Sequence, residues 1–510
     1  GNGCAARSIA ADIMVPMPAM TKTPAAPLPL ALDRDSPEPL ARQLYDQLRE
    51  LILSGRLAGG TRLPSTRALA GELGVSRNTS VAAFDQLFAE GYVEGSVGAG
   101  TFVSAELPDQ QPSRAPRPLV EASALSGPSR RGQALAALAP PRARRHRAFA
   151  VGVPELGEFP FELWSRLLAQ SWRRPDMTTQ VPGDPAGLPG LRAAIARYLA
   201  TARAVICDPD QVIVTSGVQQ GIGLACQVLL DPGDRVWVED PGYPGVNGAL
   251  AGAGMTLAPV PVDAEGLDVA AGEASAPDAR LACVTPSHHY PLGTVMSLPR
   301  RLAIIDWASR RDGWVLEDDY DSEFRYRGRP LASLQGLDRG GRVIYAGSFS
   351  KVMFPSLRLG YLVVPEHLIG VFRAVRSALD DHASLIAQPA LARFIDDGHF
   401  AAHIRRMRRL YAARQEALLE AGRRHLSGLL DLAPDDAGLH LVARLTSDTA
   451  ARMDDREAAR RAAEAGVAAG ALSAYRIRAP QPPGLVLGYA AVGEAEIAEA
   501  AAALGAALAP

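Results

Sequence analysis

Lysine is nearly absent from this sequence. Only Lys22 and Lys351 occur among 510 residues, whereas lysine and arginine together number 53, so the remaining basic residues are all arginine. A guanidinium stays protonated, but a lysine amine can lose its proton and attack an aldehyde. Lys351 is therefore a candidate for chemistry that arginine cannot perform, unless it is a chance survivor of the bias, as Lys22 shows can occur.

Cysteine pairs, long apolar runs and a marked net charge are also missing. The four cysteines lie far apart and form no CxxC pair, which argues against a disulfide framework and against a zinc or other metal site. No apolar run approaches the roughly 20 residues of a membrane span. With a net charge of −2, any nucleic-acid binding must come from a local patch. These absences predict a cytoplasmic protein.

Changes in composition divide the chain into four segments. Residues 1–31 are rich in alanine and proline and are predicted to form a disordered tail, whereas residues 32–105 form a compact, patterned block. Residues 106–150 are rich in proline, alanine and arginine, which is typical of a linker. In residues 151–510 short apolar runs alternate with helical stretches, which predicts an α/β domain with a largely parallel sheet.

The block 32–105 has the pattern of a helix-turn-helix. Ser65 is suited to cap a helix that runs to Leu73, Gly74 makes the turn, and Ser76 is suited to cap a second helix that ends near Glu90. Two short strands around a glycine-rich turn follow, which predicts a wing. A winged helix-turn-helix places its second helix in the major groove of DNA. A small three-helix interaction domain is the alternative.

Residues suited to DNA contact gather at the two helix starts and in the wing. Hydroxyls at helix N-termini suit phosphate, arginine adds charge, and glycine permits close approach of the backbone to the duplex. Arg77 and Asn78 are the best candidates to reach base edges. The predicted DNA-binding residues are Ser65, Thr66, Arg67, Ser76, Arg77, Asn78, Thr79, Gly98 and Gly100.

The neighbours of Lys351 suit a phosphate. Ser348 and Ser350 precede the lysine and Arg358 follows it, in a loop that comes directly after a predicted strand. Hydroxyls and a guanidinium bind phosphate, and the adjacent amine suits an aldehyde. Pyridoxal 5′-phosphate (PLP) carries both groups, so the sequence predicts PLP as cofactor.

Three other predicted strand ends supply what PLP further requires. Gly217, Val218 and Gln219 open a helix, whose free N–H groups suit the phosphate. Asp318 is suited to hold the proton of the pyridine nitrogen, and Tyr320 to hydrogen-bond the ring hydroxyl. Tyr243 is suited to stack on the ring. In an α/β fold such strand ends meet at one binding site.

At this point two resemblances are visible. Residues 151–510 resemble a fold-type I, class I aminotransferase, through the stretches Gly183–Arg192 and Thr285–Gly293. The segments Leu63–Arg67 and Ser76–Thr79 resemble the GntR-type winged helix-turn-helix. The combination resembles the MocR subgroup of GntR regulators. The implied fold is an N-terminal α+β winged helix-turn-helix followed by an α/β aminotransferase-like domain.

The resemblance implies roles for the site residues and an assembly. Lys351 would form the Schiff base with PLP, Ser348, Ser350 and Arg358 would hold its phosphate, and the subunits would pair head-to-tail as a homodimer. Tyr290 would also contact PLP, since it stands where aminotransferases have an asparagine beside the ring hydroxyl. Gly245 stands where GABA-responsive members have an arginine, which argues against GABA as effector.

The function predicted from the sequence is that of a regulator that binds operator DNA. It senses PLP itself, or an amine or amino acid that reacts with PLP, and it is not primarily an enzyme. An effector carboxylate would need an arginine, for which the candidates are Arg444, Arg476 and Arg478. The alternatives are an active aminotransferase with an accessory domain and a scaffold that binds no cofactor.

Overall fold

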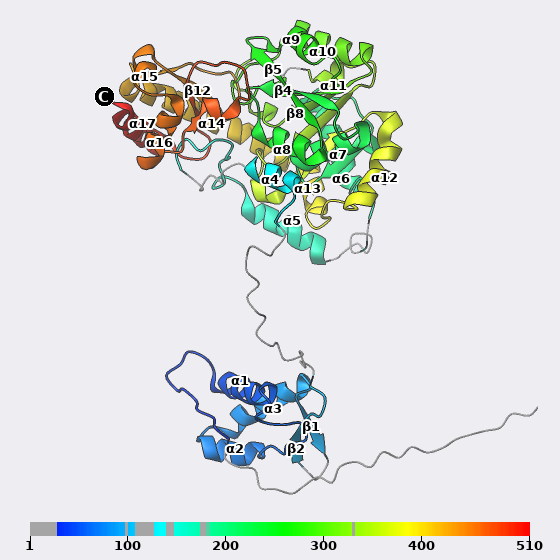
Figure 1. The fold of residues 1–510 in the computed structure, drawn as a ribbon, viewed down its shortest axis with the longest axis vertical. Helices are drawn as coiled ribbons and strands as arrows, with labels where there is room; N and C mark the ends of the chain where they lie inside the picture. The colour runs from blue at the N-terminus through cyan, green and yellow to red at the C-terminus, as the bar shows by residue number, and fades with distance from the viewer. Residues whose placement is uncertain are drawn as a thin grey trace, which may run out of the picture. The chain divides into compact units, whose positions relative to one another are not determined.

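The computed structural model describes residues 28–96, 100–107, 127–138, 147–173, 181, 183–328 and 332–510. The chain forms two compact units, Gly1–Gly127 and Pro128–Pro510 (Figure 1). Most of the predicted tail, residues 1–27, and residues 108–126 and 139–146 of the predicted linker lie outside the described residues.

The first unit is a small helical domain with a two-stranded wing. Its core is formed by fully buried leucines of α1 and α3, such as Leu48 and Leu87, around Phe84. Ser65 accepts a hydrogen bond from the Ala68 N–H, so it caps α2 as the sequence predicts. The elements are α1 (Leu40–Leu53), α2 (Thr66–Leu73), α3 (Arg77–Ala89), β1 (Val93–Ser96) and β2 (Gly100–Val103), with β1 antiparallel to β2.

The second unit contains two sheets and the helices that cover them. The first part comprises α4 (Arg130–Ala137), α5 (Phe161–Arg173), α6 (Pro189–Ala202), β3 (Val212–Thr215), α7 (Val218–Leu229), β4 (Arg235–Asp240), α8 (Pro244–Ala253), β5 (Thr256–Asp263), β6 (Gly266–Leu267), α9 (Val269–Ser275), β7 (Leu281–Val284), α10 (Leu298–Arg310), β8 (Trp314–Asp319), α11 (Leu334–Leu337), β9 (Val343–Ser348), β10 (Gly360–Val363), α12 (Ile369–Leu379) and α13 (Gln388–Asp396). The last part comprises α14 (His399–His425), β11 (Leu430–Leu432), β12 (His440–Leu445), α15 (Ser447–Arg452), α16 (Asp455–Glu464), β13 (Gly470–Ala471), β14 (Gly484–Gly488) and α17 (Glu494–Leu508). Among the described helices, none combines the length and the apolar character that crossing a membrane requires.

The large sheet has the strand order β3-β10-β9-β8-β7-β4-β5-β6. The pairs from β9 through β8, β7 and β4 to β5 are parallel, whereas β10 runs antiparallel to both β3 and β9. The sheet is therefore mixed, although most of it is parallel as the sequence predicts. Because β10 opposes both of its neighbours, β3 points the same way as β9. The carboxyl ends of β3, β9, β8, β7 and β4 consequently lie along one edge.

Helices cover both faces of this sheet, and alternate residues of each strand pack against opposite layers of helices. On β8, Leu316 packs with residues of α7, α8 and α12, whereas Val315 packs with residues of α9 and α10. On the face covered by α9 and α10, Trp237 and Trp307 stack with 4.0 Å between ring centroids, and both are fully buried. Strands buried on both faces read as continuous apolar runs, which is how the sequence predicted them.

The C-terminal part of the second unit forms a smaller antiparallel sheet, in the order β11-β12-β14-β13, with α14 and α16 against it and α17 packed on those two helices (yellow-orange to red in Figure 1). Its apolar residues join one large core together with α5, α6 and α13. The second unit therefore contains two sheets that share one core, and the edge of the large sheet lies near the small one.

The end of the predicted linker takes part in the second unit. Arg131 of α4 donates a hydrogen bond to the Gly252 carbonyl of α8, and Phe149 is fully buried and pairs with Gly488 of the small sheet. The sequence predicted a linker that continues to residue 150. Its low periodicity concealed these contacts, because they depend on residues more than a hundred positions further along the chain.

We expect Leu48→Ala to destabilise the first unit by about 2–5 kcal/mol, because it opens a cavity in the core. Leu53→Ala on the same helix is the matched control, since Leu53 is 40% exposed. Hydrogen exchange of the α1 amides is the measurement, because all five tryptophans lie in the second unit and fluorescence would not report on the first. Equal exchange in the two variants would contradict the core assignment.

Candidate functional site

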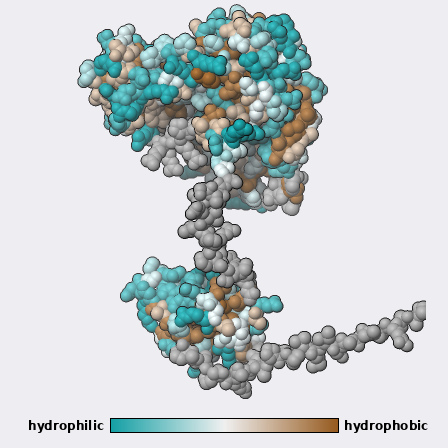
Figure 2. Space-filling view, viewed as in Figure 1, coloured by the Kyte–Doolittle hydropathy of each residue, from teal (hydrophilic) through white to brown (hydrophobic). Residues whose placement is uncertain are grey.

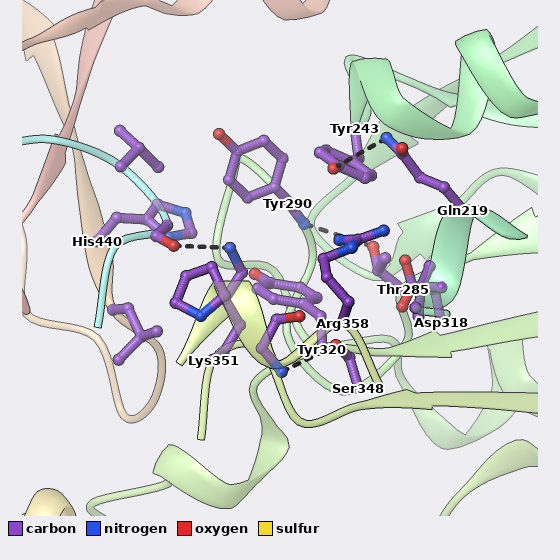
Figure 3. A pocket seen from close by; sticks show the side chains of 17 residues that line it. Gln219, Tyr243, Thr285, Tyr290, Asp318, Tyr320, Ser348, Lys351, Arg358 and His440 are labelled. Atoms are coloured by element: carbon purple, nitrogen blue, oxygen red, sulfur yellow. Dashed lines mark hydrogen bonds between the residues drawn. The ribbon is translucent and has the colours of Figure 1, made fainter. Parts of the chain in front are cut away.

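A cavity of about 340 Å³ lies at the edge of the large sheet where β3, β4, β7, β8 and β9 end (Figure 3). Its volume is at the lower end of the range of small-molecule and cofactor sites. All eleven residues that the sequence predicted for PLP line this one cavity. They are Gly217, Val218, Gln219, Tyr243, Tyr290, Asp318, Tyr320, Ser348, Ser350, Lys351 and Arg358.

Lys351 lies inside this pocket, just after β9. Its Nζ donates a hydrogen bond to the Gly152 carbonyl at 2.7 Å. Burial lowers the pKa of the Lys351 amine, and the Asp321 and Asp318 carboxylates oppose that shift. A lowered pKa increases the neutral fraction of the amine, which is the nucleophilic form.

Asp318, near the end of β8, presents a carboxylate without a full set of partners. Its Oδ1 is buried and has no hydrogen-bond partner among the described residues. Burial, with the Asp319 and Asp321 carboxylates adding to it, raises the pKa of Asp318 to about 7, while Lys351 opposes the shift. A buried acceptor left unpaired is costly, so this atom is suited to a ligand that brings a positively charged N–H.

Arg358 and the start of α7 form an anion site at one end of the pocket. Gly217, the N-cap of α7, has φ +118°, and a Cβ there would stand 3.3 Å from Arg358 Nη2. The guanidinium therefore lies directly against the free N–H groups of the helix start. The Ser350 N–H donates to Ser348 Oγ at 3.1 Å, which leaves the Ser348 hydroxyl proton free to donate. These groups together suit a phosphate.

Aromatic rings form the walls between these two ends. Tyr290 stands nearly perpendicular to Tyr243, with 5.7 Å between ring centroids, and nearly perpendicular to Tyr320 at 6.0 Å. The Tyr243 hydroxyl lies 3.5 Å from Gln219 Nε2. His440 of β12 contacts the Tyr290 ring from the small sheet. The pocket is therefore bounded by both sheets of the second unit.

Tyr320 is connected to a buried histidine that joins the two sheets. His288 Nδ1 lies 2.9 Å from Asp321 Oδ2 and 3.1 Å from the Tyr320 hydroxyl, and its Nε2 lies 3.2 Å from Asp435 Oδ2. Asp435 lies in the segment between β11 and β12. Burial alone lowers the pKa of His288, but the two carboxylates outweigh burial and raise the pKa to about 10. His288 is therefore an imidazolium that bridges two carboxylates.

The three arginines predicted for an effector carboxylate are not among the residues that line the pocket. Arg444 Nη1 donates to the Pro482 carbonyl at 2.9 Å, and Arg476 and Arg478 are exposed to solvent. The backbone N–H groups of residues 477–479 bind the Asp240 carboxylate. This part of the chain therefore secures the loop before Tyr243, and its arginine side chains are directed elsewhere.

Seven of the nine predicted DNA-contacting residues lie at the helix starts of the first unit. Arg67, Arg77 and Asn78 are exposed. Ser76 accepts from the Thr79 N–H at 3.1 Å, so its hydroxyl oxygen caps α3. Ser65 and Thr66 stand at the start of α2, Gly100 begins β2, and Gly98 lies outside the described residues.

Six further residues line the pocket that the sequence did not predict. They are Val151, Gly152, Thr285, Pro355, Leu439 and His440. Thr285 follows β7 and begins the Thr-Pro-Ser stretch that the sequence singled out, so its position after a strand was an available signal. Gly152, Leu439 and His440 carry no motif and reach the pocket only through tertiary packing.

Two known families together match most of the chain. The family described as "Aminotransferase class I and II" matches residues 157–504, and the family described as "Bacterial regulatory proteins, gntR family" matches residues 40–103.

Relatives match across both units. "Probable rhizopine catabolism regulatory protein MocR" of Rhizobium meliloti is 44% identical to this chain over 91% of the chain and 92% of its own length. The "HTH-type pyridoxine biosynthesis transcriptional regulator PdxR" of Corynebacterium glutamicum is 33% identical over 82% of the chain and 86% of its own length.

Among solved structures, the kynurenine aminotransferase of Pyrococcus horikoshii, in complex with PMP, has a TM-score of 0.65 at 26% identity. The similarity covers 76% of this chain and 96% of that one. LysN, the alpha-aminoadipate aminotransferase of Thermus thermophilus, has a TM-score of 0.64 at 27% identity, over 74% of this chain and 94% of that one. The second unit therefore has the aminotransferase fold, and the two units together match regulators over nearly the full chain.

We expect His288→Ala to destabilise the second unit by about 3–5 kcal/mol, because it leaves the buried Asp321 carboxylate without its partner. His425→Ala is the matched control, since His425 is exposed at the end of α14. The denaturation midpoint followed by tryptophan fluorescence is the measurement.

The same bridge predicts a pH dependence. The pKa of His288 is raised in the folded protein, so its stabilisation is fully present below the unfolded pKa and is lost as pH rises through about 10. The difference between wild type and His288→Ala should shrink across that range. A difference that stays constant to higher pH would contradict the imidazolium assignment.

Proposed function

Since the chain belongs to the MocR subgroup of GntR-family transcriptional regulators, we propose that it binds operator DNA through its first unit and PLP through its second. The signal is either PLP itself or a small amine that reacts with it. The observation that carries this proposal is the convergence of eleven predicted residues around Lys351 in one pocket. The names of two relatives, which refer to rhizopine catabolism and pyridoxine biosynthesis, agree with a regulator of small-molecule metabolism.

The unpaired Asp318 carboxylate supports PLP as the ligand. A pyridine nitrogen held in its protonated form would give Asp318 Oδ1 the donor that it lacks among the described residues. Arg358, the α7 N-terminus and the two serines would hold the phosphate at the other end. Tyr243 would lie against the ring, and Tyr320 beside its hydroxyl.

PLP supplies an aldehyde carbon that forms a C=N bond with an amine. Lys351 would hold this carbon until an incoming primary amine takes its place. In that exchange the C=N bond to Lys351 would break as the one to the incoming nitrogen forms, and the protons lost by that nitrogen would end on Lys351 Nζ, which would be released as a neutral amine. The released amine, already close to the Gly152 carbonyl, would no longer be tethered to the cofactor. That release is the event that the protein would sense.

The first unit would contact the operator DNA. Exposed Arg77 and Asn78 at the start of α3 are placed to enter a major groove, and Arg67 at the start of α2 to contact phosphate. Ser76 would contribute less than predicted to phosphate binding, because its oxygen already caps α3.

A homodimer in the cytoplasm, where chromosomal DNA is accessible, is the proposed working form. Figure 2 shows a hydrophobic area at the edge of the second unit where Figure 1 places α12. Val371 and Leu379 on that helix are 42% and 53% exposed, and nearby Ile386 is 59% exposed. Exposed apolar area of this kind is typical of surfaces that another subunit covers. The head-to-tail arrangement that the family resemblance implies belongs to this proposal.

An active aminotransferase with an accessory domain is the second candidate, and the aminotransferase fold of the second unit supports it. Tyr290 argues against efficient turnover, because it occupies the position of the asparagine that those enzymes place beside the ring hydroxyl. Sustained production of keto acid from amino acids, without a DNA footprint, would favour the enzyme over the regulator.

We expect the purified protein with PLP to show a visible absorbance band that Lys351→Ala abolishes while the fold is kept. Borohydride reduction and peptide mass analysis should place the cofactor on the Lys351 peptide. Lys22→Arg is the matched control, because it removes the other lysine of the chain and should leave the band unchanged. A persistent band in Lys351→Ala would contradict the proposed site.

For the first unit, we expect Arg77→Ala to weaken operator binding by about 1–3 kcal/mol, the range of one specific base contact. Footprinting at fixed salt measures it, and the absorbance band should be unaffected. Arg42→Ala is the control, since Arg42 lies on α1 and is paired with Asp46 at 3.0 Å. Equal footprints for Arg77→Ala and wild type would remove Arg77 from the interface.

A further inference from the structure

The turn that opens α7 is held by a residue behind the pocket wall. Gln220, on the first turn of the helix, is half-buried, and its Oε1 accepts a hydrogen bond from the Ser216 N–H at 3.2 Å. Ser216 directly precedes Gly217, the N-cap of α7, against which Arg358 lies. A side chain on the first turn that reaches back to a preceding N–H fixes how the chain enters a helix. Gln220 therefore holds the turn that forms the anion site.

Arg376 of α12 determines which way the Gln220 amide faces. α12 packs against α7 (Figure 1), and Arg376, which is fully buried, donates from Nη1 to Gln220 Oε1 at 2.8 Å. Oε1 thus faces two donors, the Arg376 guanidinium and the Ser216 N–H. If the amide were turned over, its NH2 group would meet both donors and could bond to neither. The amide therefore has one stable orientation, with its oxygen toward the turn.

The guanidinium of Arg376 is itself held in place. Its Nε forms an ion pair with Asp380 Oδ1 at 2.6 Å, one turn further along α12, and its Nη1 also donates to the Val214 carbonyl of β3 at 3.5 Å. A hydrogen bond from a charged donor is stronger than one between neutral groups, and burial strengthens it further. A chain of contacts therefore runs from Asp380 through Arg376 and Gln220 to Ser216.

A fixed turn matters for anion binding because the backbone supplies the donors. The first N–H groups of any helix have no acceptor within the helix, and they bind a phosphate when they point toward the same place. Here that place is beside Arg358, at the α7 end of the pocket. Residues that hold the turn lower the cost of ordering these donors when a phosphate binds, even though they do not touch it.

We propose that Gln220 and Arg376 are positioning residues that give the pocket its preference for a phosphorylated ligand over the same ligand without phosphate. This inference rests on the proposed function, since PLP is the ligand proposed for the pocket. It extends the site beyond its lining residues to α12. The discrimination between PLP and pyridoxal, its form without phosphate, would depend on the contacts behind the phosphate end.

The test compares PLP with pyridoxal, which has the same ring and aldehyde but a hydroxyl in place of the phosphate. Each is titrated into the full chain, and its apparent dissociation constant is taken from the visible band. We expect Gln220→Leu, which removes the acceptor, and Arg376→Met, which removes its charged donor, to weaken PLP binding about tenfold. The constants for pyridoxal should change by less than about twofold, because pyridoxal has no anion for the turn to bind.

Arg373→Met is the matched control on the same helix. Arg373 is paired with Asp184 at 2.5 Å, so this change removes an arginine from α12 without removing a partner of Gln220. Its PLP constant should stay within about twofold of the wild-type value. The double variant Gln220→Leu/Arg376→Met should bind PLP no more weakly than Gln220→Leu alone, because both changes break the same contact.

The outcomes separate this inference from the proposed function. If the wild-type protein forms no visible band with PLP, the proposed function is wrong. If the band forms but the variants weaken pyridoxal as much as PLP, the two residues only support the fold and the inference alone is wrong. Unchanged PLP binding in the variants, or equal weakening by Arg373→Met, would likewise contradict it. If Arg376→Met fails to fold, Gln220→Leu decides, since Gln220 is only half-buried.

Discussion

The candidate site depends on the direction of the strands in the large sheet. Because β10 opposes both β3 and β9, the strands β3, β9, β8, β7 and β4 all end at one edge. Each strand end delivers a different group to the same cavity, including the start of α7, Tyr243, Asp318 and the loop of Lys351. A single reversed strand would move its group to the opposite edge and leave the pocket incomplete.

Burial then determines the chemistry of those groups. It lowers the pKa of Lys351, which favours the reactive amine, and raises the pKa of Asp318 to about 7. A ligand that brings a protonated N–H group to Asp318 and an anion to Arg358 would compensate the charges at both ends of the pocket. The same low dielectric makes any further unpaired charge costly. Burial thus favours the reactive form of Lys351 and also raises the energetic cost of any further charge in the pocket.

The pocket also stands where the two sheets of the second unit meet. His288 connects Tyr320 in the pocket to Asp435 beside the small sheet, and His440 of β12 contacts Tyr290. A ligand that contacts Tyr320 or Tyr290 therefore acts on residues of both sheets at once. α4, at the end of the predicted linker, docks on α8, the helix that begins directly after Tyr243. In the proposed regulator, these contacts would connect a bound ligand to α4, at the end of the predicted linker.

The sequence alone predicted the features that depend on near neighbours in the chain. These are the isolated lysine, the serine caps, the glycine turns and the polar residues that follow apolar runs. All eleven cofactor residues predicted in this way line one cavity. Only the tertiary structure decided what completes the pocket. Gly152 reaches Lys351 across 199 residues, and His440 and the His288 bridge depend on packing of the small sheet. It also decided that Arg444, Arg476 and Arg478 do not line the pocket, because side-chain direction follows from packing and not from composition.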